Sequence, residues 1–393
     1  MALSIHEAQA LADGAAASLR NGDATAAREG FGRVVAEGVA SLSVHLGLAY
    51  ACQALGEDSQ AQAAVDVVLG KEPRNIRALV LKGELAQARA DDVTAVSFFR
   101  AALACAASPI PLTPDLRALV AHAQAMCDGY AERFESTLRE ALASVAQRTG
   151  APSARFSKSL DLLTGHKQLY LPAPRIYHFP ELPAVQFPAS SGFPWVPGLE
   201  AATGDIRHEV LTLMSDVEAF SPYVQRDARQ AVSRTGGMVD NPEWSACYLW
   251  KDGQRIDANA ARCPRTMAAL EEVPLAHIPG RSPSVLFSLL RPGARIPPHH
   301  GYVNTRLIVH LPLVVPRGCG FRVGNEARQW VEGKVWLFDD TIEHEAWNDS
   351  DQTRLILLFE VWRPELALRE QEHISALFQT IDRLRGGVGE WSI

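Results

Sequence analysis

Residues 305–315, with the sequence TRLIVHLPLVV, determine the fold of the C-terminal part of the chain. The character of the side chains alternates from one residue to the next, which predicts a β-strand with two different faces. Leu307 and Val309 lie on one face, which we expect in the core. Arg306 and His310 lie on the other face and should therefore face a cavity or solvent.

Similar stretches recur along the chain after residue 150. Residues 284–290 (SVLFSLL), 335–338 and 354–362 (RLILLFEVW) predict further strands, and short strands are expected around Arg322 and His344. Short strands separated by Gly, Pro, Asn and Asp are typical of a sandwich or jelly roll rather than of alternating βα units. We therefore predict a jelly roll with a ligand in its mouth.

The first third of the chain is rich in Ala and repeats every 34 residues. The repeat has four columns, namely Ala15, Ala49 and Gly83; Ala27, Ala61 and Ala95; Phe31, Val65 and Phe99; and Val34, Val68 and Ala102. Small residues let paired helices approach closely, and the larger apolar residues fill the groove between them. Gly22 and Gly56 are expected in turns inside the pairs, and Pro73 at the end of a repeat. Residues 6–108 resemble a tetratricopeptide array, and we expect a further helical pair to about residue 147 to cap it.

Composition changes near residue 150, where eight prolines follow between residues 151 and 198. We predict an α+β multidomain chain with an all-α, tetratricopeptide-like repeat domain over residues 1–148 and a Pro-rich connection over residues 149–200. The jelly-roll domain then covers residues 201–393 and ends in a helix. The apolar stripe of this last helix comprises Ile374, Leu377, Phe378, Ile381 and Leu384, and it either packs on the barrel or pairs two subunits as a homo-oligomer.

Charge and composition exclude several classes of protein. The 38 Lys and Arg against 45 Asp and Glu give a net charge of −7, which argues against a nucleic-acid partner. No apolar run approaches the roughly 18 residues of a membrane span, and the N-terminus lacks the pattern of a signal peptide. We therefore expect a cytoplasmic protein without a membrane partner, with its six scattered Cys as reduced thiols in the core.

Four of the 12 His lie between residues 299 and 344. His299 and His300 belong to PPHHG, His310 to the strand quoted first, and His344 to FDDTIEHEAWN. A single His is more often a core or surface residue, but imidazoles from separate strands can converge on one iron, zinc, copper or nickel ion.

Arg354 opens a strand that is apolar on both faces. Such a position is costly for an Arg unless it lies in solvent at the strand end or meets an anion. A metal site beside an inward Arg suits an enzyme that uses iron and 2-oxoglutarate, because the keto-acid end chelates the metal and the distal carboxylate needs a fixed cation.

Long ordered motifs carry a family resemblance. They are FSLLRPGARIPPHHGYVNTRLIVHLPL, GFRVGNEARQWVEGKVWLFDDTIEHEAWN and RLILLFEVWRPEL, with weaker similarity at WSACYLW, RCPRT and YLPAPRIYHFPEL. Residues 165–367 thereby resemble the aspartyl/asparaginyl β-hydroxylase family. The resemblance implies a double-stranded β-helix, a cupin-like jelly roll, that acts as a dioxygenase with Fe(II), 2-oxoglutarate and O2.

The resemblance also implies roles for individual residues. His299 and His344 correspond to the two metal ligands, and Gly301 stands where most 2-oxoglutarate oxygenases have a carboxylate, which is typical of this family. The co-substrate residues implied are Arg354 and Ser288 at the distal carboxylate, and His310 near the chelating end. Residues implied toward the substrate are Arg306, Trp244 and Arg322, while Asp339 and Asp340 are expected to orient the metal-bound imidazoles rather than to bind metal.

At one position the chain departs from the family. Ile308 stands where the family often has a second Arg, which weakens the case for an acidic substrate side chain. The favoured function is hydroxylation of the β-carbon of an Asp or Asn residue in a peptide or protein, with the repeats binding substrate or another partner protein. The alternatives are a hydroxylase of a free or carrier-bound small amino acid, and a catalytically silent scaffold that uses the repeats for protein binding.

Overall fold

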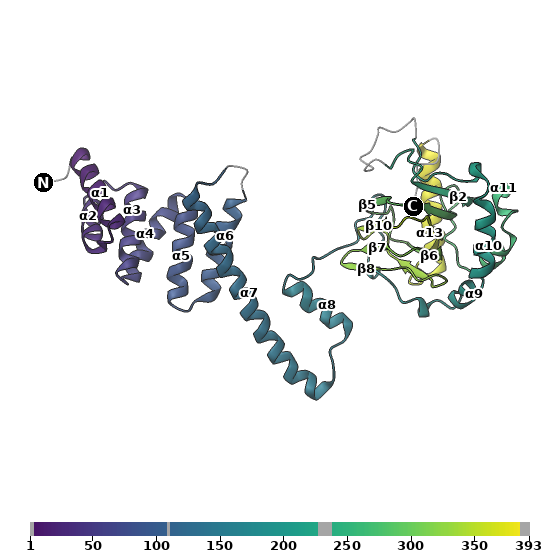
Figure 1. Cartoon of the computed structure of the whole chain (residues 1–393), viewed down its shortest axis with the longest axis horizontal. Helices are drawn as coiled ribbons and strands as arrows, with labels where there is room; N and C mark the ends of the chain where they lie inside the picture. Colours follow the sequence, from purple (N-terminus) through teal and green to yellow (C-terminus); the bar gives the residue numbers. More distant parts are fainter. Residues whose placement is uncertain (1–3, 108–110, 227–237, 386–393) are drawn as a thin grey trace. The chain divides into compact units, whose positions relative to one another are not determined.

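The computed structural model describes residues 4–107, 111–226 and 238–385 (Figure 1). The chain divides into two compact units, residues 1–160 and residues 161–393. The first unit is helical, and the second is built around β-sheets. Among the helices in the described ranges, none is both long enough and apolar enough to cross a membrane.

Helical pairs form the first unit. The helices are α1 (Ile5–Arg20) and α2 (Ala24–Ala36), α3 (Leu42–Ala54) and α4 (Asp58–Lys71), and α5 (Ile76–Ala88) and α6 (Asp92–Ala106). The second helices of the pairs begin at residues 24, 58 and 92, so the predicted repeat of 34 residues is confirmed.

The repeat columns lie where the helices touch. All members of the four columns are buried. A Cβ atom at Gly83 would come within 2.7 Å of the Phe99 ring, so this position needs glycine for the helices to approach. Gly22 (φ 84°), Gly56 (φ 72°) and Ala90 (φ 57°) occupy the turn inside each pair, and they too are 34 residues apart.

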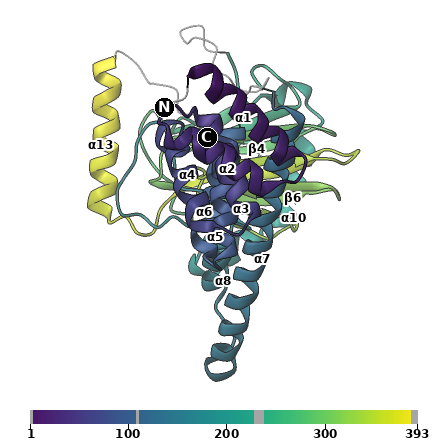
Figure 2. The same cartoon turned by 90° about the vertical axis from the view of Figure 1, so that its left-hand side faces the viewer.

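The segment after the third pair differs from the prediction of a further helical pair. Residues 114–149 form one helix of 36 residues, α7 (Pro114–Thr149), whose later turns extend past the paired helices (Figures 1 and 2). No proline interrupts the segment after Pro114, and Gly129 alone does not end the helix. Gly150, with φ 89°, follows its end, and the shorter α8 (Ala154–Leu163) comes next.

Two antiparallel sheets form the second unit, as the jelly-roll prediction required. The larger sheet has the order β1 (Ser221–Pro222), β2 (Trp244–Lys251), β4 (Val285–Leu290), β11 (Arg354–Trp362), β6 (Arg306–Val314) and β9 (Trp336–Phe338), and β3 (Gln254–Arg255) pairs with β2. The smaller sheet has the order β5 (Arg295–His299), β10 (His344–Asn348), β7 (Cys319–Val323) and β8 (Glu326–Arg328). This is the arrangement of a double-stranded β-helix.

The alternation in β6 separates two cores. Leu307 and Val309 pack with Ile206 and Val210 on the helix-covered face of the large sheet. Ile308 instead belongs to the core between the sheets. The helices of this unit that precede β4 are α9 (Val196–Ala201), α10 (Thr203–Leu213), α11 (Asp257–Ala260) and α12 (Pro264–Ala269), with short 3-10 turns at Ser190–Gly192 and Val217–Ala219.

Strand β5 was not predicted from the pattern of the sequence. Its residues Pro297 and Pro298 lack a backbone N–H group and argue against a central strand. The structure resolves this conflict because β5 is the edge strand of the smaller sheet and pairs with β10 alone.

The C-terminal helix α13 (Leu368–Arg385) packs against its own unit. Ile374 and Phe378 are buried, and Asp382 accepts a 2.9 Å hydrogen bond from Nε of the buried Arg281. Only part of the predicted apolar stripe of α13 is therefore buried, because the Leu377 side chain is 41% and the Leu384 side chain 81% exposed. All six cysteines are free and five of them are buried, so most of them lie in the core as predicted.

Two valines of α4 provide a matched test of the repeat. Val65 is 0% exposed in a repeat column, whereas Val67 on the same helix is 43% exposed. Val65→Ala should lower the free energy of unfolding of the helical unit by about 2 kcal/mol, because it removes two buried methyl groups. Val67→Ala should change it by less than about 0.5 kcal/mol. Chemical denaturation of the full chain followed by far-ultraviolet circular dichroism measures both, and equal effects would refute the repeat packing.

Candidate active site

Two imidazoles meet on neighbouring strands of the smaller sheet. The antiparallel register of β5 and β10 sets His299 directly opposite His344. Their ring centroids lie 4.1 Å apart with an angle of 52° between the planes. Residues 45 positions apart in the sequence are thus brought to one point by strand pairing.

Both imidazoles are held in the same way. Nδ1 of His299 bonds to the Pro297 carbonyl at 2.8 Å, and Nδ1 of His344 bonds to the Ile342 carbonyl at 3.1 Å. A carbonyl can only accept, so in each neutral ring Nδ1 carries the proton and Nε2 keeps its lone pair. Burial lowers the pKa of both side chains, that of His344 well below its usual value. The pair is therefore neutral and has the tautomer that binds metal ions.

A cavity between the sheets joins the imidazoles to most of the other predicted site residues. Its lining comprises Tyr223, Trp244, Ser288, Ile296, His299, Ile308, His310, Phe321, Phe338, His344, Ala346, Arg354, Ile356 and Leu358. The predicted residues Trp244, Ser288, His310 and Arg354 thus share one space with the two imidazoles.

Arg354 is a buried cation that has no acidic partner in the described part of the chain. It is 1% exposed, and its Nη2 donates to Oγ of Ser288 at 3.0 Å. Among the described residues its Nε has no hydrogen-bond partner, and no carboxylate pairs with it. Burial lowers the pKa of Arg354 to about 10, so the guanidinium stays charged at neutral pH. A buried guanidinium in this state has the charge and the free donors that an anion would need.

Ser288 and His310 complete this end of the cavity. The indole Nε1 of Trp244 donates to Oγ of Ser288 at 3.2 Å, which holds the hydroxyl beside the guanidinium. His310 lies among aromatic rings, with its centroid 4.9 Å from that of Phe338. Burial lowers its pKa well below the usual value, so this imidazole is neutral as well. Its Nδ1 has no partner within the described part of the chain.

Within the described residues, no third candidate metal ligand accompanies the two imidazoles. In the described ranges no group of three or more His, Cys, Asp or Glu side chains is arranged to hold a metal ion. At Gly301, two residues after His299, a Cβ atom would overlap the carboxyl group of Asp340. The space that a facial-triad carboxylate would use is therefore taken by another side chain.

Arg306 has a different environment from the one predicted. It does not line the cavity, and its guanidinium is buried in ion pairs with Glu360 and Asp340. The expectation that it faces the substrate is therefore not met. The two carboxylates neutralise the positive charge of its guanidinium. A buried Arg requires such partners.

Arg322 also has partners other than the predicted substrate. Arg322 bonds to Glu343 at 2.9 Å and to Glu345, outside the cavity lining.

Neither Asp339 nor Asp340 forms a hydrogen bond with the imidazole of His299 or His344. Asp339 pairs with Arg363 and accepts from Thr341, while Asp340 pairs with Arg306. The imidazoles are oriented by backbone carbonyls instead, so the predicted orienting role of the two carboxylates is corrected.

Sequence reasoning missed three residues of this region. Tyr223 stacks on Trp244 with centroids 4.0 Å apart, and the Trp330 ring lies 5.1 Å from the Arg354 guanidinium carbon. Glu360 accepts from Arg306 and from the Ser284 backbone N–H. Only Glu360 had a usable signal, because a lone carboxylate inside the apolar strand RLILLFEVW requires a buried partner.

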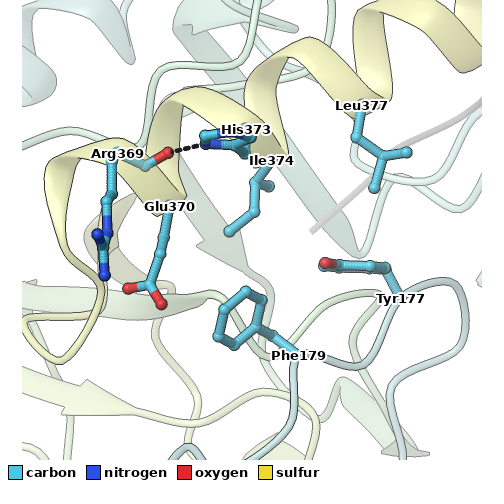
Figure 3. A pocket seen from close by; sticks show the side chains of 7 residues that line it. All are labelled: Tyr177, Phe179, Arg369, Glu370, His373, Ile374 and Leu377. Carbon is cyan, nitrogen blue, oxygen red and sulfur yellow. Dashed lines mark hydrogen bonds between the residues drawn. The ribbon is translucent and has the colours of Figure 1, made fainter.

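A second pocket lies away from these residues. It has a volume of about 550 Å³ and is open beside α13 (Figure 3). Its lining comprises Tyr177, Phe179, Arg369, Glu370, His373, Ile374 and Leu377, and includes none of the predicted site residues.

The fold and the cavity define the class: a double-stranded β-helix with a candidate two-histidine metal site. Residues 200–364 match the model of a family described as aspartyl/asparaginyl beta-hydroxylase. This part of the chain is similar to that family.

Curated relatives are also similar to part of the chain. An aspartyl/asparaginyl beta-hydroxylase of Mus musculus is 39% identical over 137 residues, which are 34% of this chain and 18% of that protein. An ornithine lipid ester-linked acyl 2-hydroxylase of Rhizobium tropici is 34% identical over 178 residues, 44% of this chain and 58% of that protein. The chain thus spans about a fifth of the mammalian relative and somewhat over half of the bacterial one.

Solved structures resemble parts of the chain at low scores. PcrH from Pseudomonas aeruginosa has a TM-score of 0.29 at 24% identity, over 32% of this chain and 93% of that one. A predicted oxalate decarboxylase from Thermotoga maritima has a TM-score of 0.21 at 11% identity, over 30% of this chain and 81% of that one.

The contact between Gly301 and Asp340 generates a prediction. Gly301→Asp should not complete a metal-binding triad but should lower the free energy of unfolding by about 2 kcal/mol or more, because two carboxyl groups would compete for one buried space. Gly198→Asp is the matched control, since nothing lies within 4 Å of a Cβ built there. Thermal denaturation with and without Fe(II) measures both changes. Tighter iron binding by a stable Gly301→Asp variant would contradict the prediction.

Proposed function

We propose that residues 161–393 form a hydroxylase that depends on Fe(II), 2-oxoglutarate and O2. The observation that carries the proposal is the shared cavity, whose lining includes two adjacent imidazoles and a buried guanidinium that has no carboxylate partner among the described residues. The match of residues 200–364 to the model of a hydroxylase family supports it.

The residues of the cavity fit the metal. His299 and His344 would bind Fe(II) through Nε2, because their Nδ1 atoms already bond to carbonyl groups. Two protein ligands leave the remaining coordination positions to the co-substrate, O2 and water. When bound, iron and 2-oxoglutarate supply the oxidation of a C–H bond by O2, with release of succinate and CO2.

The remaining residues of the cavity would bind and orient 2-oxoglutarate. Arg354 would hold the distal carboxylate of 2-oxoglutarate, and the Ser288 hydroxyl, fixed by Trp244, would add a hydrogen bond. His310 is neutral and would donate or accept a hydrogen bond near the chelating end. The apolar lining of the cavity would exclude water, which strengthens the electrostatic attraction between the diacid and Arg354.

Three classes of substrate are candidates for this hydroxylase. The mouse and human relatives are named for Asp and Asn, which supports the β-carbon of one of these residues in a peptide or protein. The name of the Rhizobium relative adds an acyl group as a second candidate, and the apolar cavity wall favours it. A small amino acid, free or carrier-bound, is the third.

The helical repeats would bind the substrate protein or another partner protein. A catalytically silent domain is the opposing proposal, and it predicts no 2-oxoglutarate turnover with iron.

His344→Ala tests the metal site. Succinate formation by the full chain with Fe(II) and 2-oxoglutarate should fall by about 100-fold or more, because one of two metal ligands is lost. The fold should persist, as judged by circular dichroism. His300→Ala is the control, since His300 does not line the cavity. Full turnover by His344→Ala would refute the assignment.

Arg354→Lys tests the anion site. The KM for 2-oxoglutarate should rise by about 10–100-fold, because an ammonium cannot reproduce the planar fork of the guanidinium. Burial that lowers the pKa of Arg354 to about 10 should lower that of a Lys further. The variant should therefore lose its charge and its co-substrate affinity as the pH rises from about 7 to 9, while the wild type keeps both. Steady-state kinetics over this range measures the difference, and parallel profiles would contradict the assignment.

A further inference from the structure

Two neutral side chains contact the guanidinium of Arg354. The Ser288 hydroxyl accepts a 3.0 Å hydrogen bond from Nη2. The guanidinium carbon lies over the Trp330 ring, 5.1 Å from its centroid. This distance is within the roughly 6 Å over which an aromatic face attracts a cation. Because the proposed function gives Arg354 the distal carboxylate of 2-oxoglutarate, a residue that fixes this guanidinium also affects how the co-substrate binds.

Two other buried arginines of the second unit are fixed in a different way. Arg306 and Arg363 are as fully buried as Arg354, but each pairs with one or two carboxylates. A carboxylate fixes a guanidinium by occupying its N–H donors, which then cannot bind a ligand. An aromatic ring attracts the cation through its face and leaves the donors at the edge of the guanidinium free. Trp330 therefore holds Arg354 without competing with a carboxylate of the co-substrate.

Trp330 is itself held firmly by its neighbours. It lies between β8 and β9 and is 6% exposed. Its ring stacks on that of Trp336, with centroids 5.8 Å apart and 17° between the planes, and the centroid of the Phe321 ring lies 5.6 Å away. Closely packed rings in a core keep one arrangement, so the plane of the Trp330 ring is fixed by the fold. The guanidinium that lies over this ring is restricted by it.

Trp330 acts through Arg354 rather than by contact with a ligand. Arg354 and Ser288 belong to the cavity lining, whereas Trp330 does not. A guanidinium forms two parallel hydrogen bonds with a carboxylate only when the two planar groups are nearly coplanar. A ring against one face of the guanidinium prevents it from tilting or retreating. The position of its donors is thereby fixed, and with it the length of a diacid that reaches from the candidate metal site to Arg354.

We propose that Trp330 is a positioning residue for the co-substrate, and that it sets both the affinity for 2-oxoglutarate and the preference for a diacid of that length. The inference rests on the proposed function and deepens it, since it names a residue that controls the co-substrate without contacting it. Without the ring, the guanidinium gains room to move. The longer homologue 2-oxoadipate, which has one more methylene group, is then discriminated against less.

Two variants of Trp330 test the role of its ring. Calorimetry measures the binding of 2-oxoglutarate and of 2-oxoadipate to the full chain in the presence of Mn(II). Trp330→Met removes the ring and should weaken the binding of 2-oxoglutarate by about tenfold, because a desolvated contact between a cation and a ring is lost. It should also reduce the preference for 2-oxoglutarate over 2-oxoadipate by about threefold or more. Trp330→Phe keeps a ring, so its affinity and its preference should stay within about threefold of the wild type.

Trp250→Met is the matched control. Trp250 is partly buried against the core on the helix-covered face of the large sheet, and it does not line the cavity. The same truncation at this position should lower the midpoint of thermal unfolding but leave the affinity for 2-oxoglutarate and the preference over 2-oxoadipate unchanged. The comparison separates a positioning role of Trp330 from a general loss of stability.

Several outcomes would overturn the proposal. They are a folded Trp330→Met variant with the affinity and preference of the wild type, equal losses in Trp330→Met and Trp330→Phe, and an equal loss of affinity in Trp250→Met. Failure of the proposed function looks different, because the wild type would then bind neither diacid in a Mn(II)-dependent way.

A fluorinated tryptophan at position 330 gives the same test if Trp330→Met does not fold, which circular dichroism reports. Fluorine atoms nearly keep the size of the indole but weaken the attraction of its face for a cation. The binding of 2-oxoglutarate should therefore weaken as fluorine atoms are added to the ring. Unchanged binding across such a series would contradict the role of the ring.

Discussion

The pairing of β5 with β10 is the constraint on which the site depends. Its register sets His299 opposite His344, and the backbone carbonyls of Pro297 and Ile342 then fix both rings with Nε2 free. Because the strands belong to one sheet, the spacing of the imidazoles follows from the fold rather than from flexible side chains. A slip of the register by one residue would turn one ring to the opposite face of the sheet.

Buried charge is distributed unequally around this site. Arg306 and Arg363 are each met by carboxylates, which makes them part of the stable core. Among the described residues, Arg354 contacts the Ser288 hydroxyl and the Trp330 ring but no carboxylate, although it is equally buried. The cost of burying a lone guanidinium is the physical reason for expecting an anionic ligand there.

The sequence predicted some parts of the site and not others. Alternation in β6 correctly placed Leu307 and Val309 in a core, and motif similarity identified six residues that line the cavity: His299, His344, His310, Ser288, Trp244 and Arg354. Arg306 was misjudged because strand alternation gives the face of a residue but not its partner, and Glu360 is 54 residues away. The long helix α7 was misjudged because helical periodicity alone does not tell one long helix from two short ones.

The sequence by itself determined where helices give way to strands, the 34-residue repeat and the residue types available for chemistry, because these depend on local periodicity and composition. Only the tertiary structure decided which charges are paired, that Asp340 fills the space beside Gly301, and that α13 packs on its own unit. These features depend on contacts between residues far apart in the chain, where strand register and side-chain volume, rather than local preference, choose the partner.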